Sequence, residues 1–387
     1  MSFHFDTGAK GAVVLAAGGT GGHLFPAQAL AEELVRRGYL VHLMTDPRVR
    51  EYGSKFPAAQ IHEIPSGSIS LSKPMTIFSG GSKLFRGFMA ARKILNTLKP
   101  LAVVGFGGYP SFPPLVAARF SGIPSCIHEQ NAVMGRANRA ISKHVSCIAS
   151  SFPNIHKLPD GVKSKLVMTG NPVRETVLAA AQEEYETPTP DKPFKLLVFG
   201  GSQGARIFSD VVPEALAGLP SNIKKRLQLT QQVRPEDMER VKESYVASGI
   251  DADLASFFSD MPKRIANAHL VIARSGASTV AELSVIGRPG ILVPLAHAID
   301  NDQLLNAREF AQSGAGWIIE QPEFDAERVS GLLTKLRFSE ADLTSAASAS
   351  KALGRPDAAQ RLADAVEKIA LNKVAKDAGY DPSAKQD

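Results

Sequence analysis

Apolar and polar positions follow one repeating pattern along most of the chain: a short apolar run, a turn, and then apolar residues at helical spacing. The first repeat has its apolar run at residues 13–17, a glycine-rich turn at 18–22, and Ala27, Leu30 and Leu34 on one face of a helix. Such alternation of buried strands and amphipathic helices predicts a doubly wound α/β fold with parallel sheets. The other strands of the first half are expected at 40–45, 60–64, 101–106, 125–129, 145–149 and 166–169.

The pattern starts again after an acidic, proline-bearing segment, EEYETPTPDKP, that has no periodicity. A strand at 194–199, a second glycine-rich turn and a helix from Ala205 repeat the opening, and this repeat predicts two similar Rossmann-like domains. Further strands are expected at 227–231, 254–258, 270–274 and 290–295. We expect a first domain at 1–183, a linker at 184–193, a second domain at 194–345, C-terminal helices at 346–372 that pack back toward the first domain, and a flexible tail at 373–387.

Composition narrows the class of protein. The 387 residues suffice for two cores, and 44% hydrophobic with 21% charged residues is ordinary for a globular protein. The net charge of +6 comes without a long run of Lys or Arg, which argues against nucleic acid and favours anionic small molecules or an anionic membrane surface. Cys126 and Cys147 lack the spacing of a zinc site or a disulfide framework, so both are expected to be small buried side chains.

The chain shows neither a secretory leader nor an apolar run near the roughly 20 residues that a membrane-spanning helix needs. These features predict a cytoplasmic protein that can still lie against a membrane. A Gly/Ser-rich stretch at 65–82 reads as a loop long enough to suggest a function.

Residues 83–98 predict a helix with two kinds of surface. One apolar stripe should face the core: Leu84, Phe88, Ala91, Leu95 and Leu98. Phe85 and Met89 lie off this stripe, beside the cations Lys83, Arg86, Arg92 and Lys93. Surplus apolar residues flanked by cations are typical of a helix that lies on anionic lipid, with Phe88 close to the same face. A wide core face with a solvated basic rim explains the pattern equally well, so both interpretations stay open.

Candidate chemistry gathers where the predicted strands of the first half end, which is the edge where open α/β sheets bind ligands. The turn GGTGGH starts a helix and carries His23, a side chain that titrates near neutral pH. Its spacing is neither that of a dinucleotide-binding G-x-G-x-x-G nor that of a P-loop. Four polar residues, HEQN at 128–131, follow the strand at 125–129, and a turn ending in a cation, GNPVR at 170–174, follows the strand at 166–169.

In the second half, GGSQGAR at 200–206 and RSGASTVAE at 274–282 each place a glycine turn at a helix start, which suits a diphosphate. Glu282 lies one to two turns into the second of these helices, where a carboxylate can accept hydrogen bonds from the vicinal hydroxyls of a ribose. A solvated helix residue is the alternative for Glu282. The polar loop PLAHAIDNDQ at 294–303 follows the next strand at the same edge.

These five motifs, GGTGGH, HEQN, GNPVR, GGSQGAR and RSGASTVAE, closely resemble in kind and order those of the MurG family, over residues 13 to about 371. The resemblance implies the GT-B glycosyltransferase fold, α/β with two doubly wound domains facing a cleft. It implies transfer of N-acetylglucosamine from UDP-GlcNAc to the C4 hydroxyl of undecaprenyl-diphospho-N-acetylmuramoyl-pentapeptide (lipid I), giving lipid II for peptidoglycan. The second domain would hold the donor, and the first would receive the acceptor as a peripheral protein on the cytoplasmic side of the bacterial inner membrane.

The resemblance also implies the residues that contact UDP-GlcNAc. They are Thr20, Gly21, Gly22, Asn131, Arg174, Ser202, Phe258, Ala277, Ser278, Thr279, Glu282 and Gln303. Arg174 and Ser202 would approach the diphosphate, Glu282 the ribose, and Phe258 the uracil. Gln303 would bond the sugar hydroxyls, but Asp302 stands before it where the family often has a second glutamine, so the role of Asp302 is open.

An α-linked donor and a β-linked product require inversion, hence one in-line displacement through an oxocarbenium-like state. His23 is predicted as the general base for the acceptor hydroxyl, with Glu129 as the alternative. Glycine-turn N–H groups, a helix N-terminus and Arg174 suit the charge that develops on the departing diphosphate. The D-x-D patterns at 251–253 and 300–302 resemble metal-binding pairs of another transferase fold, yet with these cations and helix ends we expect neither a metal nor another cofactor.

Several alternatives remain open from the sequence. Another UDP-sugar enzyme of the same fold, such as a non-hydrolysing UDP-N-acetylglucosamine 2-epimerase or a diacylglycerol glucosyltransferase, would share the motifs' chemistry, as would a nucleotide-binding protein without turnover. The glycine spacing disfavours an NAD-dependent oxidoreductase. Expected partners are UDP-GlcNAc, lipid I and an anionic membrane, with no nucleic acid; other cell-wall synthesis proteins are candidates that the sequence does not identify.

Overall fold

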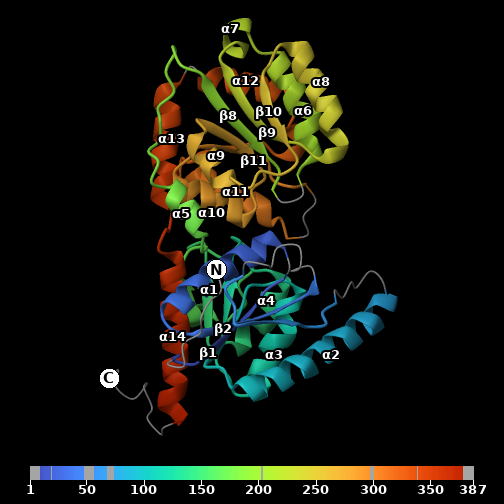
Figure 1. Ribbon diagram of the computed structural model, residues 1–387, viewed down its shortest axis with the longest axis vertical. Coiled ribbons are helices and arrows are strands. Elements are labelled where there is room, and N and C mark those ends of the chain that lie inside the picture. The colour runs from blue at the N-terminus through green and yellow to red at the C-terminus, as the bar shows by residue number, and fades with distance from the viewer. Residues whose placement is uncertain are drawn as a thin grey trace. The chain divides into compact units, whose positions relative to one another are not determined.

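The computed structural model describes residues 9–18, 20–47, 56–67, 74–201, 204–296, 300–337 and 339–377. The chain divides into two compact units, one made of Met1–Arg174 with Asp357–Asp387 and the other of Glu175–Pro356. Each unit is an α/β structure on its own parallel sheet (Figure 1).

The first unit is built on a seven-stranded sheet in the order β3-β2-β1-β4-β5-β6-β7, with every pairing parallel. The strands are β1 (Ala12–Ala16), β2 (Leu40–Thr45), β3 (Gln60–Glu63), β4 (Ala102–Gly105), β5 (Ser125–Glu129), β6 (Cys147–Ser150) and β7 (Leu166–Met168). Because β1 lies between β2 and β4, the loops that leave β1 and β4 run to opposite sides, and ligands of open α/β sheets bind where such loops diverge. We call this place, at the carboxyl ends of β1 and β4, the crevice of the first sheet.

Helices cover both faces of this sheet because successive strand residues point to opposite sides. Val13 and Leu15 of β1 pack with α1 and α14, whereas Val14 and Ala16 pack with α2 and α3. Strands buried on both faces read as continuous apolar runs, which explains why the sequence revealed them. The helices are α1 (Gly21–Arg36), α2 (Pro74–Leu98), α3 (Phe112–Phe120), α4 (Arg136–Ile141) and α14 (Ala358–Asp377), with short 3-10 turns η3 (Tyr109–Ser111), η4 (Ser142–His144) and η5 (Lys163–Lys165).

The second unit repeats the design on a six-stranded sheet in the order β10-β9-β8-β11-β12-β13, again all parallel. The strands are β8 (Phe194–Phe199), β9 (Leu227–Gln232), β10 (Ala252–Ala255), β11 (Leu270–Ala273), β12 (Gly290–Leu292) and β13 (Gly316–Ile318). Its crevice lies where the loops after β8 and β11 diverge.

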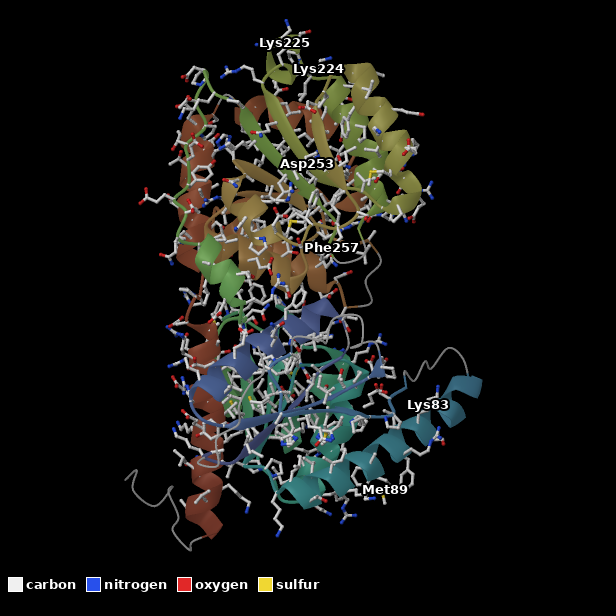
Figure 2. The ribbon with its side chains drawn as sticks, in the orientation of Figure 1. Lys83, Met89, Lys224, Lys225, Asp253 and Phe257 are labelled. Atoms are coloured by element: carbon white, nitrogen blue, oxygen red, sulfur yellow. The ribbon has the colours of Figure 1, made fainter. Side chains whose placement is uncertain are left out.

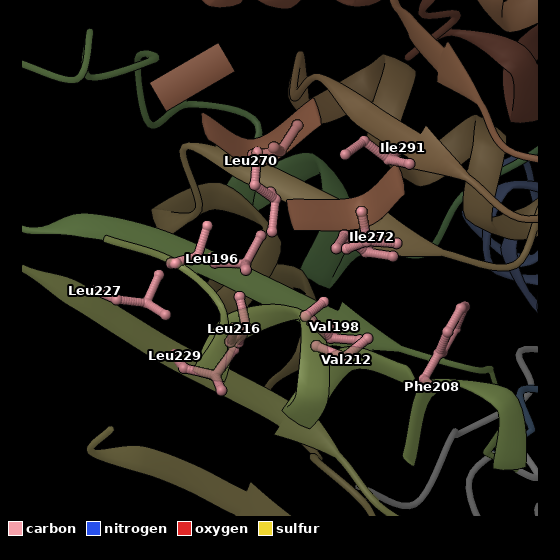
Figure 3. Packing of buried hydrophobic residues seen from close by; sticks show 14 of the residues in the cluster. Leu196, Val198, Phe208, Val212, Leu216, Leu227, Leu229, Leu270, Ile272 and Ile291 are labelled. Atoms are coloured by element: carbon pink, nitrogen blue, oxygen red, sulfur yellow. The ribbon is translucent and has the colours of Figure 1, made fainter. Parts of the chain in front are cut away.

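Figure 3 shows the core of this unit, where side chains of four strands meet helix α6. Leu196 and Val198 of β8 face Val212 and Leu216 of α6, and all four are buried. The helices are α5 (Glu175–Ala180), α6 (Arg206–Ala217), α7 (Ser221–Lys224), α8 (Met238–Ser248), α9 (Met261–Asn267), α10 (Ala277–Ile286), α11 (Asp302–Gln312), α12 (Ala326–Arg337) and α13 (Glu340–Leu353), with η6 (Pro235–Asp237) and η7 (Gln321–Glu323).

Two elements differ from the sequence-based expectation. Helix α2 begins at Pro74, so much of the segment expected as a loop at 65–82 is helical. Gly80 and Gly81 each cost about 1 kcal/mol relative to alanine inside a helix, which hid this start. Further along α2, Gly87 permits close packing, since a Cβ there would lie 2.1 Å from the carbonyl oxygen of Pro65. Strand β10 ends at Ala255, so Phe258 follows the strand instead of belonging to it.

The boundary between the units lies at Arg174, before the segment that composition marked as a linker. That segment is bound to the second unit: Tyr185 donates to the carbonyl oxygen of His269 at 2.9 Å, and Arg288 donates to the carbonyl oxygens of Glu183 and Glu184 at 3.0 and 3.1 Å. The Arg288 guanidinium also donates to three more carbonyls and is 1% exposed. A fully satisfied buried cation anchors the chain here, and composition carries no sign of it.

The C-terminal helices divide between the units: α13 belongs to the second and α14 to the first. Arg37, just after α1, forms ion pairs with Asp364 and Glu367 of α14 at 2.7 and 2.6 Å. Beneath them, Leu362 and Val366 complete the core on that face of the first sheet.

Candidate functional site

His23 lies at the crevice of the first sheet, in the first turn of α1 and against the loop that follows β4. A Cβ added to Gly107 would lie 3.4 Å from its Cε1 atom, and one added to Gly18 or Gly108 would lie 3.4 Å from its Cδ2 atom. Gly107 and Gly108 also have φ of +82° and +73°, a region that L side chains rarely adopt. These glycines therefore shape a backbone cradle around one imidazole ring.

The start of α1 presents the positive end of a helix to the same crevice. Thr20 is the N-cap residue; its carbonyl oxygen accepts from the N–H groups of His23 and Leu24 at 3.0 and 2.9 Å, and its side chain makes no capping bond. The described first turn contains no acidic residue that would neutralise the helix end. A Cβ on Gly22 would meet nothing within 4 Å, so a ligand can approach this turn closely.

His128, the first residue of HEQN, is fully buried at the end of β5. Its Nε2 lies 3.0 Å from the carbonyl oxygen of Gly170, and its Nδ1 lies 3.2 Å from Nε2 of Gln130. Gln130 also donates to the carbonyl oxygen of Phe106 at 2.9 Å. Burial lowers the pKa of His128 to about 4, with a further lowering from the nearby His23, so His128 is neutral at physiological pH.

Glu129 is buried and accepts three hydrogen bonds. The donors are the backbone N–H of Asn131 at 3.1 Å, the backbone N–H of Gly135 at 2.8 Å and the side-chain amide of Asn138 at 2.8 Å. Burial raises the pKa of Glu129, and these donors oppose that rise. Both carboxyl oxygens are thus engaged in holding the loop before α4, which suits an organising role better than proton abstraction from a substrate.

The GNPVR turn brings Arg174 to the first turns of α1. Gly170 has φ of +84°, and its carbonyl oxygen accepts from both Thr169 at 3.1 Å and His128. The Arg174 guanidinium carbon lies 4.0 Å from the centre of the Phe25 ring. The side-chain amide of Asn171 is buried without a hydrogen-bond partner in the described part of the chain, a costly arrangement that the sequence did not flag.

In the second unit, the N-terminus of α10 and the start of α11 are joined by hydrogen bonds. Ser275 Oγ donates to the carbonyl oxygen of Gln303 at 2.8 Å, and Asn306 donates to the carbonyl oxygen of Ser275 at 3.1 Å. The side chain of Gln303 accepts from the N–H of Leu295 at 3.0 Å. This network brings Gln303 beside the helix that carries Ala277, Ser278, Thr279 and Glu282.

Phe258, the residue expected to contact the uracil, does not offer an exposed ring. Phe258 is buried, and the Arg264 guanidinium carbon lies 4.0 Å from the centre of its ring. The exposed aromatic side chain at this edge is Phe257, which is 69% exposed (Figure 2). Ser202 lies outside the described residues. Nearby, a Cβ on Gly200 would lie 2.3 Å from the backbone nitrogen of Ala205, so position 200 leaves no room for a side chain.

The two D-x-D patterns lie in different surroundings. Asp253 pairs with Arg264, and Asp302 is the first residue of α11. Among the described residues, no group of three or more His, Cys, Asp or Glu side chains could hold a metal ion. Cys126 and Cys147 face each other across β5 and β6 as free, buried thiols, as their spacing predicted.

Helix α2 carries an exposed apolar surface that extends onto α3. Phe85 and Met89 are 64% and 48% exposed, and Phe120 at the end of α3 is 65% exposed. Phe88 joins them, with its ring 6.5 Å from that of Phe85 and 5.7 Å from that of Phe120. Lys83, Arg86, Arg92, Lys93 and Arg119 are exposed around these residues, and Figure 2 shows Lys83 and Met89 projecting outward from α2.

We refer to Phe85, Phe88, Met89 and Phe120 as the aromatic patch. The sequence pattern identified three of its members but not Phe120. Phe120 lies more than twenty residues after the end of α2 and joins the patch because α3 packs on α2. No helix in the described part of the chain is long and apolar enough to cross a membrane.

Comparison with known proteins identifies the class first. Residues 13–150 match the glycosyltransferase family 28 N-terminal domain, and residues 195–362 match the C-terminal domain of the same family. The crystal structure of Acinetobacter baumannii MurG is similar at a TM-score of 0.75 and 31% identity, over 92% of this chain and 99% of that one. The two doubly wound units, each built on a parallel sheet, and these matches together show that the chain has the GT-B glycosyltransferase fold.

Curated relatives identify the member of that class. A UDP-N-acetylglucosamine--N-acetylmuramyl-(pentapeptide) pyrophosphoryl-undecaprenol N-acetylglucosamine transferase of Rhizobium etli is 51% identical over 365 residues, 94% of this chain and 97% of that protein. The protein of the same name from Rhizobium rhizogenes is 51% identical over 371 residues, 95% of this chain and 98% of that protein. The chain belongs to the MurG family.

Proposed function

We propose that this protein transfers N-acetylglucosamine from UDP-GlcNAc to lipid I, producing lipid II for peptidoglycan. The observation that carries the proposal is 51% identity, over 94% of the chain, to a transferase named for this reaction. Family membership at this identity disfavours the epimerase and glucosyltransferase alternatives, and neither gains a specific observation from the structure.

The second unit is the proposed donor site. The N-terminus of α10, with Ala277, Ser278 and Thr279, offers backbone N–H groups to the diphosphate, as does the turn that contains Ser202. Glu282 would accept from the ribose hydroxyls, and Gln303 would bond the sugar. We propose that the uracil lies against the corner formed by Phe257 and Phe258, where the exposed ring offers a stacking surface.

The first unit is the proposed acceptor side, with His23 as general base. Its ring lies in a glycine cradle at the open end of the sheet, and the imidazole of a histidine is a common general base for removal of a hydroxyl proton. The positive end of α1 with Thr20, Gly21 and Gly22 would contact the donor sugar, Asn131 its hydroxyls, and Arg174 its diphosphate. Glu129 is the weaker candidate because its oxygens already accept three hydrogen bonds.

The aromatic patch with its cations is the proposed membrane contact. An acceptor whose diphosphate hangs from an undecaprenyl chain stays in the bilayer, so the enzyme must come to it. Three apolar side chains, each about half exposed or more, next to exposed Lys and Arg residues fit the interface of an anionic bilayer. The proposal therefore adds a peripheral location on the inner face of the bacterial plasma membrane.

One assay separates the proposed function from its alternatives. The protein is incubated with UDP-GlcNAc, with and without a lipid I analogue, and released UDP and sugar products are measured. The transferase releases UDP only with the acceptor. UDP-N-acetylmannosamine formed without acceptor would indicate an epimerase, and UDP binding without turnover would indicate a nucleotide-binding protein; either result would refute the proposal.

A further inference from the structure

We propose that His128 is a positioning residue for the transfer reaction: it fixes the GNPVR turn so that Arg174 is held at the first turns of α1. The inference rests on the proposed role of Arg174 at the donor diphosphate. His128 has no contact with solvent, so it acts through the chain that it binds.

The hydrogen bonds of His128 assign the position of its proton. A carbonyl oxygen only accepts, so the bond of 3.0 Å to Gly170 requires the proton on Nε2. Nδ1 then accepts from the Gln130 amide at 3.2 Å. The opposite tautomer, or an imidazolium, would set an Nδ1–H donor against the amide donor of Gln130. The ring is therefore locked in one neutral form between two strand ends.

The two partners of His128 lead to different parts of the crevice. Gln130 also binds the carbonyl of Phe106, directly before the two glycines that cradle His23. Gly170 begins the turn that ends at Arg174, four residues later. One buried imidazole thus couples the end of β4 with the turn after β7, although these strands are separated by β5 and β6 in the sheet.

The GNPVR turn carries the link from His128 to Arg174. Gly170 is held at a positive φ by two donors to its carbonyl oxygen, from His128 and from Thr169. The next residue, Asn171, buries an amide that finds no partner within the described chain. Arg174 then stacks on Phe25, at the helix end that points toward the crevice.

The test is a double-mutant cycle on the full-length protein, with UDP affinity and kcat as readouts. His128→Leu removes both hydrogen bonds at similar size, whereas His128→Gln keeps an Nε2–H donor that can reach Gly170. His42→Leu, at another buried histidine of the same sheet, is the control for general destabilisation. All variants are assayed at a temperature where circular dichroism shows them folded.

We expect His128→Leu to weaken UDP binding about tenfold in the natural protein but less than twofold in an Arg174→Ala background, because residues that act through one another are not additive. His128→Gln should recover most of the loss, and His42→Leu should leave UDP affinity unchanged. Equal losses in both backgrounds, or an equal loss in His42→Leu, would overturn the inference while leaving the proposed function intact. If Arg174→Ala does not weaken UDP binding, the diphosphate role of Arg174 fails, and the inference fails with it.

Discussion

The guanidinium of Arg174 is stacked on the ring of Phe25, at 4.0 Å from guanidinium carbon to ring centre. Phe25 lies in α1 one turn after the glycine-rich start, and Arg174 is the last residue of the first unit before the chain enters the second. Arg174, the cation proposed to face the donor diphosphate, is thus oriented by the ring of Phe25, which lies far from it in the sequence.

This stacking predicts that Phe25 supports donor binding without touching the donor. A cation–π contact contributes about 0.5–2 kcal/mol, so Phe25→Leu should weaken UDP binding by about two- to thirtyfold. Phe25→Tyr keeps the ring face and should bind nearly as the natural protein does. Isothermal titration with UDP measures the change, and equal affinities for the Leu and Tyr variants would exclude the stacking as the cause.

His23 is predicted to contribute to the chemical step and not to donor binding. General-base catalysis accounts for about 10²–10⁴-fold in rate, so His23→Ala should lower kcat within that range while the Kd for UDP changes little. Steady-state kinetics with a lipid I analogue measure kcat, and titration measures Kd. Turnover near that of the natural protein would remove His23 from the mechanism.

The glycine cradle predicts that alanine substitutions at two glycines with similar backbone conformations affect kcat differently. Gly107 and Gly161 have φ of +82° and +78°, so alanine is strained at both, at a cost of about 1 kcal/mol or more of folding free energy. Only at Gly107 would the new Cβ contact the His23 ring, since nothing lies within 4 Å at Gly161.

Both alanine variants should therefore lose similar stability in urea unfolding, but only Gly107→Ala should lose kcat as well, because its methyl group would lie against the imidazole, 3.4 Å from Cε1. A normal kcat in a folded Gly107→Ala protein would show that the cradle does not set the position of His23.

The aromatic patch predicts salt-sensitive binding to anionic vesicles. A variant with Phe85, Met89 and Phe120 changed to Ser removes three exposed apolar side chains, each worth about 1.5–3 kcal/mol if fully buried in lipid, and should lose at least tenfold in vesicle affinity. Added salt should weaken the natural protein's binding because the surrounding cations are screened.

Val246→Ser is the matched control for the patch, since Val246 is 73% exposed on α8 of the second unit. Sedimentation with vesicles of phosphatidylglycerol and phosphatidylcholine measures the partition. Unchanged binding of the triple variant, or an equal loss in Val246→Ser, would contradict a specific contact through this face.

The buried His128 predicts that the protein loses stability in mild acid. Its pKa is about 4 when folded and 6.5 ordinarily, so between these values the unfolded chain binds the additional proton. Above pH 6.5 this difference in proton binding does not lower the free energy of unfolding. As the pH falls from 6.5 toward 4, the free energy of unfolding declines by about 1.4 kcal/mol per pH unit. Burial also lowers the pKa of His42 and His62, which adds to the loss in the same direction.

Urea unfolding at pH 7 and pH 5 measures this difference in stability. His128→Gln, which cannot be protonated, should show a smaller difference between the two pH values than the natural protein. His42→Gln should keep the part of this pH-dependent loss of stability that His128 causes. An unchanged difference in His128→Gln would show that other groups dominate the acid response.

Much of the fold followed from the sequence because strands buried on both faces are continuous apolar runs. The strands at 40–45, 125–129 and 194–199 were predicted to the residue. The start of α2 was missed because Ser79, Gly80, Gly81 and Ser82 lower the local helix propensity. Local composition gave no sign that Arg288, more than a hundred positions later, binds the segment expected as a linker.

For the candidate site, motif spacing predicted which loops lie at the ligand-binding edge, but it did not predict how each side chain is placed. HEQN was recognised as polar residues at a strand end, yet only the hydrogen bonds distinguish the buried His128 and Glu129 from a ligand-facing residue. Phe257 and Phe258 are adjacent in sequence and alike in chemistry, so nothing in the sequence tells which of the two is exposed. Such assignments depend on the directions of side chains after packing.

The return of α14 to the first unit has a consequence for how the protein is made. Leu362, Val366 and their neighbours fill a face of the first sheet that the ribosome began to synthesise some 350 residues earlier. Until α14 has been synthesised, the apolar surface that it covers on α1, β4, β5 and β6 stays exposed to water, even when the second unit is complete. A fragment that ends at Arg174 would therefore lack part of the core of the first unit and would be prone to aggregate. A circular permutant that joins α14 to the segment before β1 would encode this unit as one continuous chain.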